Sequence, residues 1–215
     1  MNPERFRRIR ETLARRQPDL TVLMESVNKT HNFSAILRSC DAVGVLEAHG
    51  VMPEKGIDLH HHTSAGTTRW MGVRVHEDVR SAIGHLHGEG FTVVAAHPSD
   101  RTRDFRGIDL TRPIAFMVGA ELFGLSEEGI SLADETVMIP MAGMVRSLNV
   151  SVATALLLFE AFRQRDAKGM YEEARIPAGE FKRLLFEWSY PEIAQVLRKK
   201  GQPFPALSDQ GEILP

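Results

Sequence analysis

Residues 114–165 read IAFMVGAELFGLSEEGISLADETVMIPMAGMVRSLNVSVATALLLFEAFRQR, and this stretch decides the expected fold. It contains two short apolar runs, 114–118 and 136–139, which have the length of buried strands and are followed by a glycine and a proline. Each run precedes a stretch of helical character, the first over 126–133 and the second over 149–165. Strands that alternate with helices in this way predict an α/β fold with a mainly parallel sheet.

The same alternation extends toward the N-terminus. We predict strands over 21–24, 48–52 and 92–96, helices over 33–43 and 76–87, and an irregular loop over 54–69. The helix over 33–43 should have Asn32 as its N-cap, because an asparagine side chain readily accepts a hydrogen bond from the first turn. Outside this core we expect helices over 5–16, 179–188 and 191–200, followed by a proline-rich tail.

Charge is distributed unevenly along the chain, although the net charge is only −2. Residues 1–20 carry six arginines and three acids, and residues 163–200 carry nine basic and six acidic side chains, so each segment has a net charge of +3. The region 21–162 has a net charge of −6. Phosphate contacts require clustered Lys and Arg, so one interpretation is an enzyme core with polyanion-binding extensions. Solvated helix faces are the other interpretation.

Length and composition are those of an ordinary globular protein. The chain has 215 residues, of which 43% are hydrophobic and 25% charged, and this excludes a disordered or fibrous protein. No window reaches the roughly 18 uncharged apolar residues of a membrane span, and no apolar run of a signal peptide follows the basic N-terminus. The single cysteine, Cys40, excludes an intramolecular disulfide. We therefore expect a soluble, cytoplasmic protein.

The loops that follow the predicted strands are the candidate functional sites, because open parallel sheets bind ligands beyond the carboxyl ends of their strands. Three of these loops carry polar or glycine-rich sequence. The first, 28–32, leads into a helix that carries Arg38. The second, 119–124, has a glycine at each end and Glu121 between them, and the third is 140–149.

Two common classes of α/β enzyme are disfavoured by the motifs that are missing. No G-x-G-x-x-G follows the first strand, and no G-x-x-x-x-G-K-[ST] is present, so neither a dinucleotide enzyme nor a nucleotide hydrolase fits. Three adjacent histidines, His60, His61 and His62, lie in the predicted loop. Adjacent histidines in a loop do not form a pre-organised ligand set, so we expect no metal site.

Taken together, three motifs identify a family. Asn32-x-x-Ala35-x-x-Arg38, Gly119-x-Glu121-x-x-Gly124 and Ser147-Leu148-Asn149-Val150-Ser151-x-Ala153 occur in this order. They resemble the three sequence motifs of the SpoU family of SPOUT RNA 2'-O-methyltransferases, and the resemblance covers about residues 21–165. The segments Arg15–Val22, Tyr190–Ile193 and Lys199–Gly201 resemble the extensions of one subgroup of this family, which methylates the ribose of guanosine 18 in the D-loop of tRNA.

The resemblance implies a fold and a domain organisation. A parallel-sheet SPOUT domain would span 21–165, with a deep trefoil knot over about 114–165. A basic helical extension over 1–20 and a helical extension with a tail over 166–215 would flank it. Family members are homodimers that pack knot against knot, and the apolar stretch 150–159 is a plausible part of that interface.

The resemblance also implies a cofactor and a set of site residues. The loops of the knot would hold S-adenosylmethionine in a bent shape, and the family's cofactor positions correspond to Ala96, His97, Gly119, Ile139, Met141 and Leu148. The expected catalytic set is Arg38, Asn32, Glu121, Ser147 and Asn149. The basic ends would bind tRNA, and we assign this role to Arg7, Arg8, Arg15, Arg16, Lys199 and Lys200.

The role of Arg38 and the choice of substrate stay open at this point. Arg38 could anchor a phosphate beside the reactive ribose, or it could act as a base after local deprotonation, although a guanidinium is normally charged and a poor base. Two other functions also compete: a methyltransferase that acts on another tRNA or rRNA site, and a non-catalytic RNA-binding protein with the same fold. An intact Arg38 and an intact Ser147-Leu148-Asn149 motif disfavour the second of these.

Overall fold

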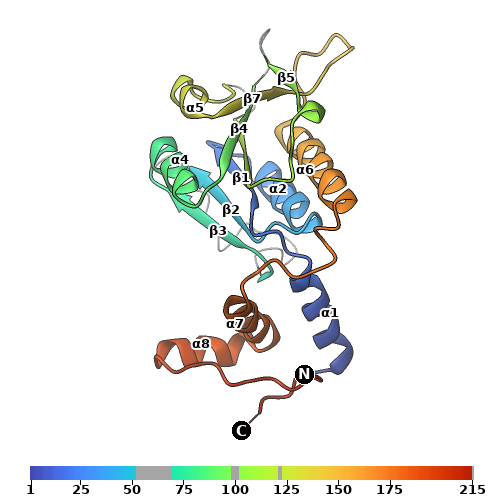
Figure 1. Ribbon diagram of the computed structural model, residues 1–215. Coiled ribbons are helices and arrows are strands. Elements are labelled where there is room, and N and C mark those ends of the chain that lie inside the picture. The colour runs from blue at the N-terminus through green and yellow to red at the C-terminus, as the bar shows by residue number, and fades with distance from the viewer. Residues whose placement is uncertain (52–68, 98–101, 121–122, 215) are drawn as a thin grey trace. The chain divides into compact units, whose positions relative to one another are not determined.

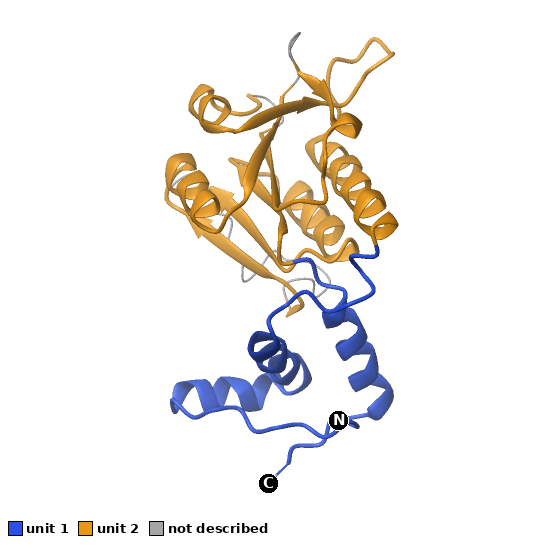
Figure 2. Cartoon of the chain, viewed as in Figure 1, with its two compact units in different colours: residues 1–17, 169–215 blue, residues 18–168 orange. Residues whose placement is uncertain are grey.

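The chain folds into two compact units, as seen in a computed structural model that describes residues 1–51, 69–97, 102–120 and 123–214 (Figures 1 and 2). Unit 1 combines residues 1–17 with residues 169–215, and unit 2 comprises residues 18–168. Unit 1 therefore contains most of both basic segments of the sequence, and it carries twelve Lys or Arg residues and nine Asp or Glu residues. Unit 2 carries fourteen basic and nineteen acidic residues.

Unit 2 is built on a seven-stranded sheet with the order β3-β2-β1-β6-β4-β7-β5. The strands are β1 (Leu20–Glu25), β2 (Glu47–Val51), β3 (Gly72–His76), β4 (Thr92–Ala96), β5 (Arg103–Asp104), β6 (Ile114–Gly119) and β7 (Glu135–Met138). All six pairings between neighbouring strands are parallel, which confirms the predicted fold class. Every residue of β1 is buried, as expected for a central parallel strand that is covered on both faces.

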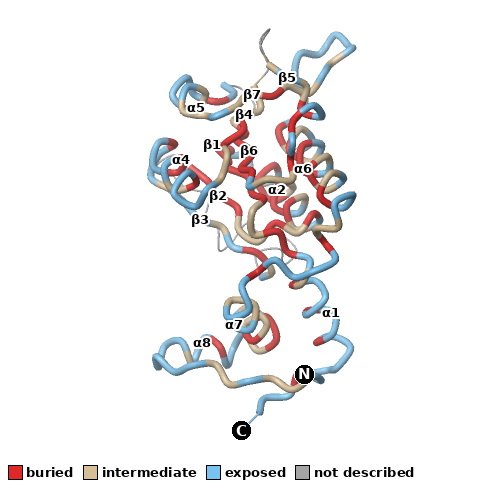
Figure 3. The backbone as a smooth tube through the Cα atoms, in the orientation of Figure 1, coloured by how far each residue is buried: buried red, intermediate tan, exposed pale blue. Residues whose placement is uncertain are grey.

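Helices cover both faces of this sheet (Figure 1). They are α2 (Thr30–Ala42), α4 (Val79–Gly88), α5 (Glu127–Leu132) and α6 (Val150–Ala167), with a short 3-10 helix η2 (Phe105–Gly107) before β6. One core cluster joins Val22 of β1 to Phe33 of α2 and Leu157 of α6, and a second joins Leu23 to Ile83 of α4. Because alternate residues of a strand point to opposite faces, α2 and α6 cover one face and α4 and α5 the other (Figure 3).

Two strands and the starts of two helices differ from the predictions. Strand β3 was not predicted, and the helix expected over 76–87 begins only at Val79, after the N-cap Asp78. The two-residue strand β5 is too short to give a periodic signal. Helix α2 begins at Thr30, so the prediction of Asn32 as its N-cap is wrong: Asn32 lies within the first turn and is buried. Of the predicted loop, residues 54–68 lie outside the described part of the chain.

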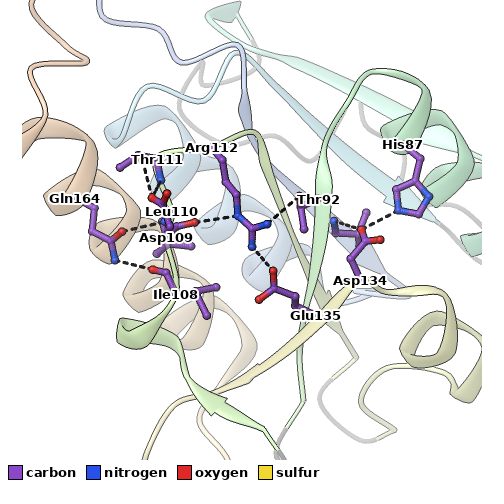
Figure 4. A network of polar contacts seen from close by, with 11 residues as sticks. His87, Thr92, Ile108, Asp109, Leu110, Thr111, Arg112, Asp134, Glu135 and Gln164 are labelled. Carbon is purple, nitrogen blue, oxygen red and sulfur yellow. Dashed lines mark hydrogen bonds and ion pairs between the residues drawn. The ribbon is translucent and has the colours of Figure 1, made fainter.

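Polar contacts join the start of β7 to the start of β4 and to the segment that precedes β6 (Figure 4). Arg112, just before β6, forms an ion pair with Glu135 at the start of β7. Asp134 Oδ2 accepts a hydrogen bond from the backbone N–H of Val93 (2.7 Å) and lies 2.9 Å from Nε2 of His87. These contacts stabilise the side of the sheet at which the strands begin. They leave the opposite side, at which the strands end, available for a ligand site.

Arg165, near the end of α6, is fully buried and ties the same region together. Its guanidinium donates to the carboxylate of Asp19 (2.6 Å) and to the carbonyl oxygens of Leu110 (2.9 Å) and Arg112 (2.8 Å). A buried charge needs this kind of complete pairing, because an unpaired one is strongly destabilising. Arg165 therefore fixes α6 to the segments that precede β1 and β6.

Unit 1 is formed by three helices and the C-terminal tail, with α1 (Pro3–Ala14), α7 (Ala178–Ser189) and α8 (Pro191–Lys199). The predicted apolar face of α1 is buried, and α1 packs against α7. The tail closes onto α1 at Gly211, where an added Cβ would lie 2.4 Å from Cγ of Phe6. The hydroxyl of Tyr190 donates to the carbonyl oxygen of Gly211 (2.7 Å), which holds the tail to the start of α8.

Three histidines meet where β2, β3 and α4 pack together. Nδ1 of His49 lies 2.9 Å from Nε2 of His76, and their ring centroids are 5.2 Å apart at an interplanar angle of 21°. These two distances and this angle mean that the rings lie nearly in one plane, with one edge of each ring directed at the other. The ring of His85 lies 5.6 Å from that of His49. Burial, together with the neighbouring His76, His85 and Arg74, lowers the pKa of His49 to about 3.

This cluster predicts a loss of stability in mild acid. Folded His49 stays neutral down to about pH 3, whereas an unfolded histidine takes up a proton near pH 6.5. The unfolded state therefore binds the extra proton between these values. The contribution of His49 to the free energy of unfolding is complete above pH 6.5 and falls as the pH drops toward 3, by at most about 1.4 kcal/mol per pH unit.

Urea unfolding of the wild type and of His49→Asn at pH 7.5, 6.0 and 5.0 measures this effect. The stability advantage of the wild type over the variant should shrink as the pH falls, because the variant lacks the titrating ring. An advantage that stays constant across the three pH values would contradict the assignment of a strongly lowered pKa to His49.

Candidate active site

A cavity of about 380 Å3 lies at the carboxyl ends of β6, β4 and β7, which are neighbours in the sheet. Ala96, His97, Gly119, Ile139, Met141 and Leu148, the six residues predicted to bind the cofactor, all line it. A larger cavity of about 940 Å3 lies within unit 1, but none of the predicted site residues lines that one. The cavity in unit 2 is therefore the candidate active site.

The parallel sheet itself brings these residues together. Because neighbouring strands run in the same direction, their carboxyl ends meet at one edge. Gly119 ends β6, Ala96 ends β4 in register with Val137 of β7, and the N–H of His97 extends that ladder by donating to the carbonyl oxygen of Val137 (3.0 Å). The floor of the cavity is thus backbone of fixed geometry.

The glycine-rich loop after β6 closes one side of the cavity. The N–H of Gly124 donates to the carbonyl oxygen of Ala120 (2.8 Å), and Gly124 has a φ of +67°, a left-handed conformation that favours glycine. A Cβ added to Gly119 would lie 2.2 Å from the carbonyl carbon and oxygen of Gly124. Only glycine fits at position 119, because the two arms of the turn touch there. Glu121, within this loop, lies outside the described residues.

The loop after β7 forms another side and leads directly into α6. Ser147 is exposed and lines the cavity together with Leu148. Asn149 is the N-cap of α6: its Oδ1 accepts hydrogen bonds from the N–H (2.9 Å) and the hydroxyl (2.6 Å) of Ser151. The motif Ser147-Leu148-Asn149 therefore lines the cavity at two positions and caps the start of α6 with the third.

Two predicted catalytic residues meet between α2 and α6. Nδ2 of Asn149 donates to Oδ1 of Asn32 (3.2 Å), and Asn32 is only 2% exposed. Arg38 lies further along α2, where it is exposed, and it is not among the residues that line the cavity. The structure thus brings Asn32 together with Asn149 and sets Ser147 in the cavity wall, and it leaves Arg38 facing solvent.

Several cavity residues were missed by sequence reasoning. Val118, Leu125 and Val137 contribute apolar surface, and Phe123 and Arg146 stand at the opening with exposed side chains. Val118 could have been found, because it is the last residue of the predicted strand 114–118, and Val137 lies within the predicted strand 136–139. Arg146 directly precedes the Ser147 motif, but a single arginine in a loop gives no signal of its own.

Among the basic residues assigned to RNA binding, the assignment of Arg16 needs correction. Arg7, Arg8, Arg15, Lys199 and Lys200 are exposed in unit 1, as phosphate contacts require. Arg16 is only 1% exposed, and its guanidinium carbon lies 5.2 Å from the ring centroid of Trp188. This packing makes Arg16 part of the interior of unit 1, so it has almost no surface to offer a phosphate.

In the described part of the chain, no three His, Cys, Asp or Glu side chains are placed so that they could hold a metal ion. His60, His61 and His62 are outside that part. Among the same residues, no helix is long and apolar enough to cross a membrane.

The fold and the cavity define an α/β protein that binds a small molecule beyond the carboxyl ends of a parallel sheet, with a glycine turn and a helix N-terminus at its walls. Comparison with known proteins identifies the family. Residues 19–159 match the model of the SpoU rRNA Methylase family, and residues 163–215 match the model described as SpoU, rRNA methylase, C-terminal. This chain belongs to the SpoU methylase family.

Individual relatives extend this result. The chain is 51% identical to the tRNA (guanosine(18)-2'-O)-methyltransferase of Escherichia coli K12, over 99% of this chain and 94% of that protein. The A. aeolicus TrmH/SpoU tRNA modifying enzyme superimposes with a TM-score of 0.81 at 40% identity, covering 88% of this chain and 97% of that one. The SpoU methyltransferase AviRb from Streptomyces viridochromogenes, in complex with the cofactor AdoMet, has a TM-score of 0.63 at 26% identity, covering 73% and 62%.

Proposed function

We propose that this chain transfers a methyl group from S-adenosylmethionine to the ribose 2'-hydroxyl of guanosine 18 in tRNA. One observation carries the proposal: the six residues that match the family's cofactor positions line one cavity beyond the strand ends. The 51% identity to a tRNA (guanosine(18)-2'-O)-methyltransferase, over nearly the full length of both chains, supports this choice of substrate.

The residues present fit this cofactor. The cavity has the size of a small-molecule site, and its wall consists mainly of apolar side chains such as Val137 and Leu148, together with the backbone at Gly119. Such a wall suits the faces of a purine and a ribose. When bound, S-adenosylmethionine supplies a methyl group on a positively charged sulfur, which is a strong electrophile without a metal or redox partner. We therefore expect that EDTA does not change the activity.

The reaction needs a positioned oxygen and a path for its proton. The ribose 2'-oxygen attacks the methyl carbon, the carbon–sulfur bond breaks and its electron pair stays on the sulfur of the departing S-adenosylhomocysteine, and the hydroxyl proton passes to solvent water. Arg38 is exposed on α2, where it can pair with a phosphate next to the reacting ribose and hold the oxygen in line. This role is favoured over that of a base, because a guanidinium offers five N–H donors to a phosphate and has no acceptor for a proton.

The other predicted catalytic residues act by position. Asn32 and Asn149 form the hydrogen bond that joins the start of α2 to the start of α6, so they fix the helix that carries Arg38 relative to the cavity wall. Ser147 lines the cavity and is exposed, which allows it to contact the substrate. Glu121 is assigned to the site by the family motif alone.

We also propose that the active form is a homodimer, that the chain folds with the trefoil knot of its family, and that it works in the cytoplasm.

The support for the dimer is an apolar stripe on α6. Val152, Leu156 and Phe159 are between 42% and 52% exposed, and their spacing of four and three residues places them on one helix face. A second copy of the chain would cover this stripe.

The basic residues of unit 1 are proposed to provide much of the tRNA affinity. Each phosphate contact that is lost should reduce the slope of log affinity against log salt by roughly 0.7 to 0.9. The double variant Lys199→Gln, Lys200→Gln should therefore bind tRNA more weakly and with a slope that is shallower by about 1.4 to 1.8. Filter binding between 50 and 300 mM KCl measures this slope.

A matched control is Arg80→Gln, because Arg80 is an exposed arginine of α4 that is paired with Glu128 (2.7 Å) in the acidic unit. It should leave the slope unchanged. If the double variant binds tRNA like the wild type at every salt concentration, these lysines do not contact phosphate.

The function is tested by nucleoside mass spectrometry. Unmodified tRNA, and ribosomal RNA in a parallel reaction, are incubated with the purified protein and S-adenosylmethionine and then digested. The proposal expects 2'-O-methylguanosine from tRNA only. A product from ribosomal RNA alone would identify a methyltransferase with another substrate, and no product from either RNA would indicate a binding protein without turnover.

A further inference from the structure

Glu25, the last residue of β1, is a buried acid for which the proposed chemistry gives no role. It is only 7% exposed, although a buried carboxylate is costly unless it is fully hydrogen-bonded. In the sheet it pairs in register with Gly119, the residue at which the glycine-rich loop leaves β6. Glu25 therefore stands beside the first residue of this loop.

The side chain of Glu25 holds the far end of the loop, at Ser126. Oε2 of Glu25 accepts a hydrogen bond from the backbone N–H of Ser126 (2.9 Å), and Oε1 accepts one from the Ser126 hydroxyl (2.6 Å). Oγ of Ser126 in turn accepts from the N–H of Gly129 and caps α5 (2.9 Å). A Cβ on Gly129 would lie 3.1 Å from Oε2 of Glu25, so a small residue at this position lets the carboxylate approach the helix.

The loop that Glu25 brackets is a wall of the candidate active site. Of its described residues, Ala120, Phe123, Gly124 and Leu125 all line the cavity. Glu25 itself is not a lining residue. The backbone of Glu25 thus lies beside the start of this wall, and its side chain holds the end of the wall through Ser126.

We propose that Glu25 is a positioning residue, which acts through Ser126 to hold the wall formed by Ala120, Phe123, Gly124 and Leu125 in the shape that binds S-adenosylmethionine. This inference rests on the proposed function, because it takes the cofactor from there. Glu25 contributes to cofactor affinity and leaves the binding of tRNA unaffected. A carboxylate that only stabilised α5 would affect the stability of the fold and leave the affinity for the cofactor unchanged.

The test compares Glu25→Ala, Glu25→Gln and Ser126→Ala with a control. Calorimetry with S-adenosylmethionine alone should show a dissociation constant that is about tenfold higher for Glu25→Ala and severalfold higher for Ser126→Ala. Glu25→Gln keeps an acceptor for the Ser126 N–H and should restore most of the affinity. In steady-state assays, KM for S-adenosylmethionine should rise in the alanine variants, and KM for tRNA should not.

The control is Asp78→Ala, because Asp78 is an acid that caps α4 by accepting a hydrogen bond from the N–H of Ser81 (2.7 Å), away from the cavity. It should lower the melting temperature without changing cofactor affinity. If Glu25→Ala does not fold, the affinity of Ser126→Ala for S-adenosylmethionine decides the test. Wild-type affinity in every folded variant would overturn the role of Glu25, whereas a wild-type protein that does not bind S-adenosylmethionine would overturn the proposed function instead.

Discussion

Replacing Arg38 with alanine is expected to reduce the rate of methyl transfer by at least about 1000-fold, the scale on which removing a group that positions the reacting atoms acts. The affinity for S-adenosylmethionine should change by less than about threefold, because Arg38 is exposed on α2 and does not line the cofactor cavity. The variant should therefore separate the transfer step from cofactor binding.

Single-turnover transfer to tRNA measures the rate, and calorimetry measures the cofactor affinity. Arg38→Lys distinguishes the two proposed roles of the arginine, because it keeps a charge that can pair with phosphate but loses the planar, bidentate geometry. Residual activity well above that of the alanine variant supports the phosphate anchor. An alanine variant that retains most of the wild-type rate would remove Arg38 from the mechanism.

Replacing Gly119 with alanine is expected to weaken S-adenosylmethionine binding by at least about 100-fold, because a backbone clash cannot be relieved by moving one side chain. The added Cβ would lie 2.2 Å from backbone atoms of Gly124, so the turn must open. Opening it moves the cavity wall formed by Ala120, Gly124 and Leu125.

Gly143→Ala is the matched control for this change, because nothing lies within 4 Å of a Cβ at that position, although the loop 140–149 also borders the site. It should bind S-adenosylmethionine like the wild type. Calorimetry with both variants, together with circular dichroism to verify folding, measures the difference. A folded Gly119→Ala with near wild-type affinity would show that this turn is not part of the cofactor site.

Most of the fold could be predicted from periodicity, because the buried strands of a parallel sheet are short, continuous apolar runs. Strand β4 was predicted with its observed ends, and the start of α5 was predicted from its N-cap Ser126. Strand β3 was missed because its sequence, Gly72–His76, is largely exposed and lies at a sheet edge, where no buried run marks it. The order of the strands depends on long-range pairing, which local sequence does not contain.

The candidate site was predictable where the chain itself sets the geometry. The six cofactor positions follow from the family resemblance, they lie at strand ends and in the loops that follow them, and all six line the cavity. Side-chain environment was harder to predict. Asn32 was expected to cap a helix and instead hydrogen-bonds to Asn149, 117 residues away in the sequence, and Arg16 was expected on the surface but packs against Trp188. Both outcomes depend on tertiary packing that no local pattern encodes.

The central claim concerns one oxygen atom, the 2'-hydroxyl of guanosine 18, and one measurement addresses it directly. Two otherwise identical tRNAs are prepared, one with guanosine and one with 2'-deoxyguanosine at position 18, and each is incubated with the protein and methyl-labelled S-adenosylmethionine. We expect about one methyl group per guanosine-containing tRNA and none in the deoxy-substituted tRNA. Equal labelling of both tRNAs would contradict the account, because the methyl group would then reside on another atom or at another position.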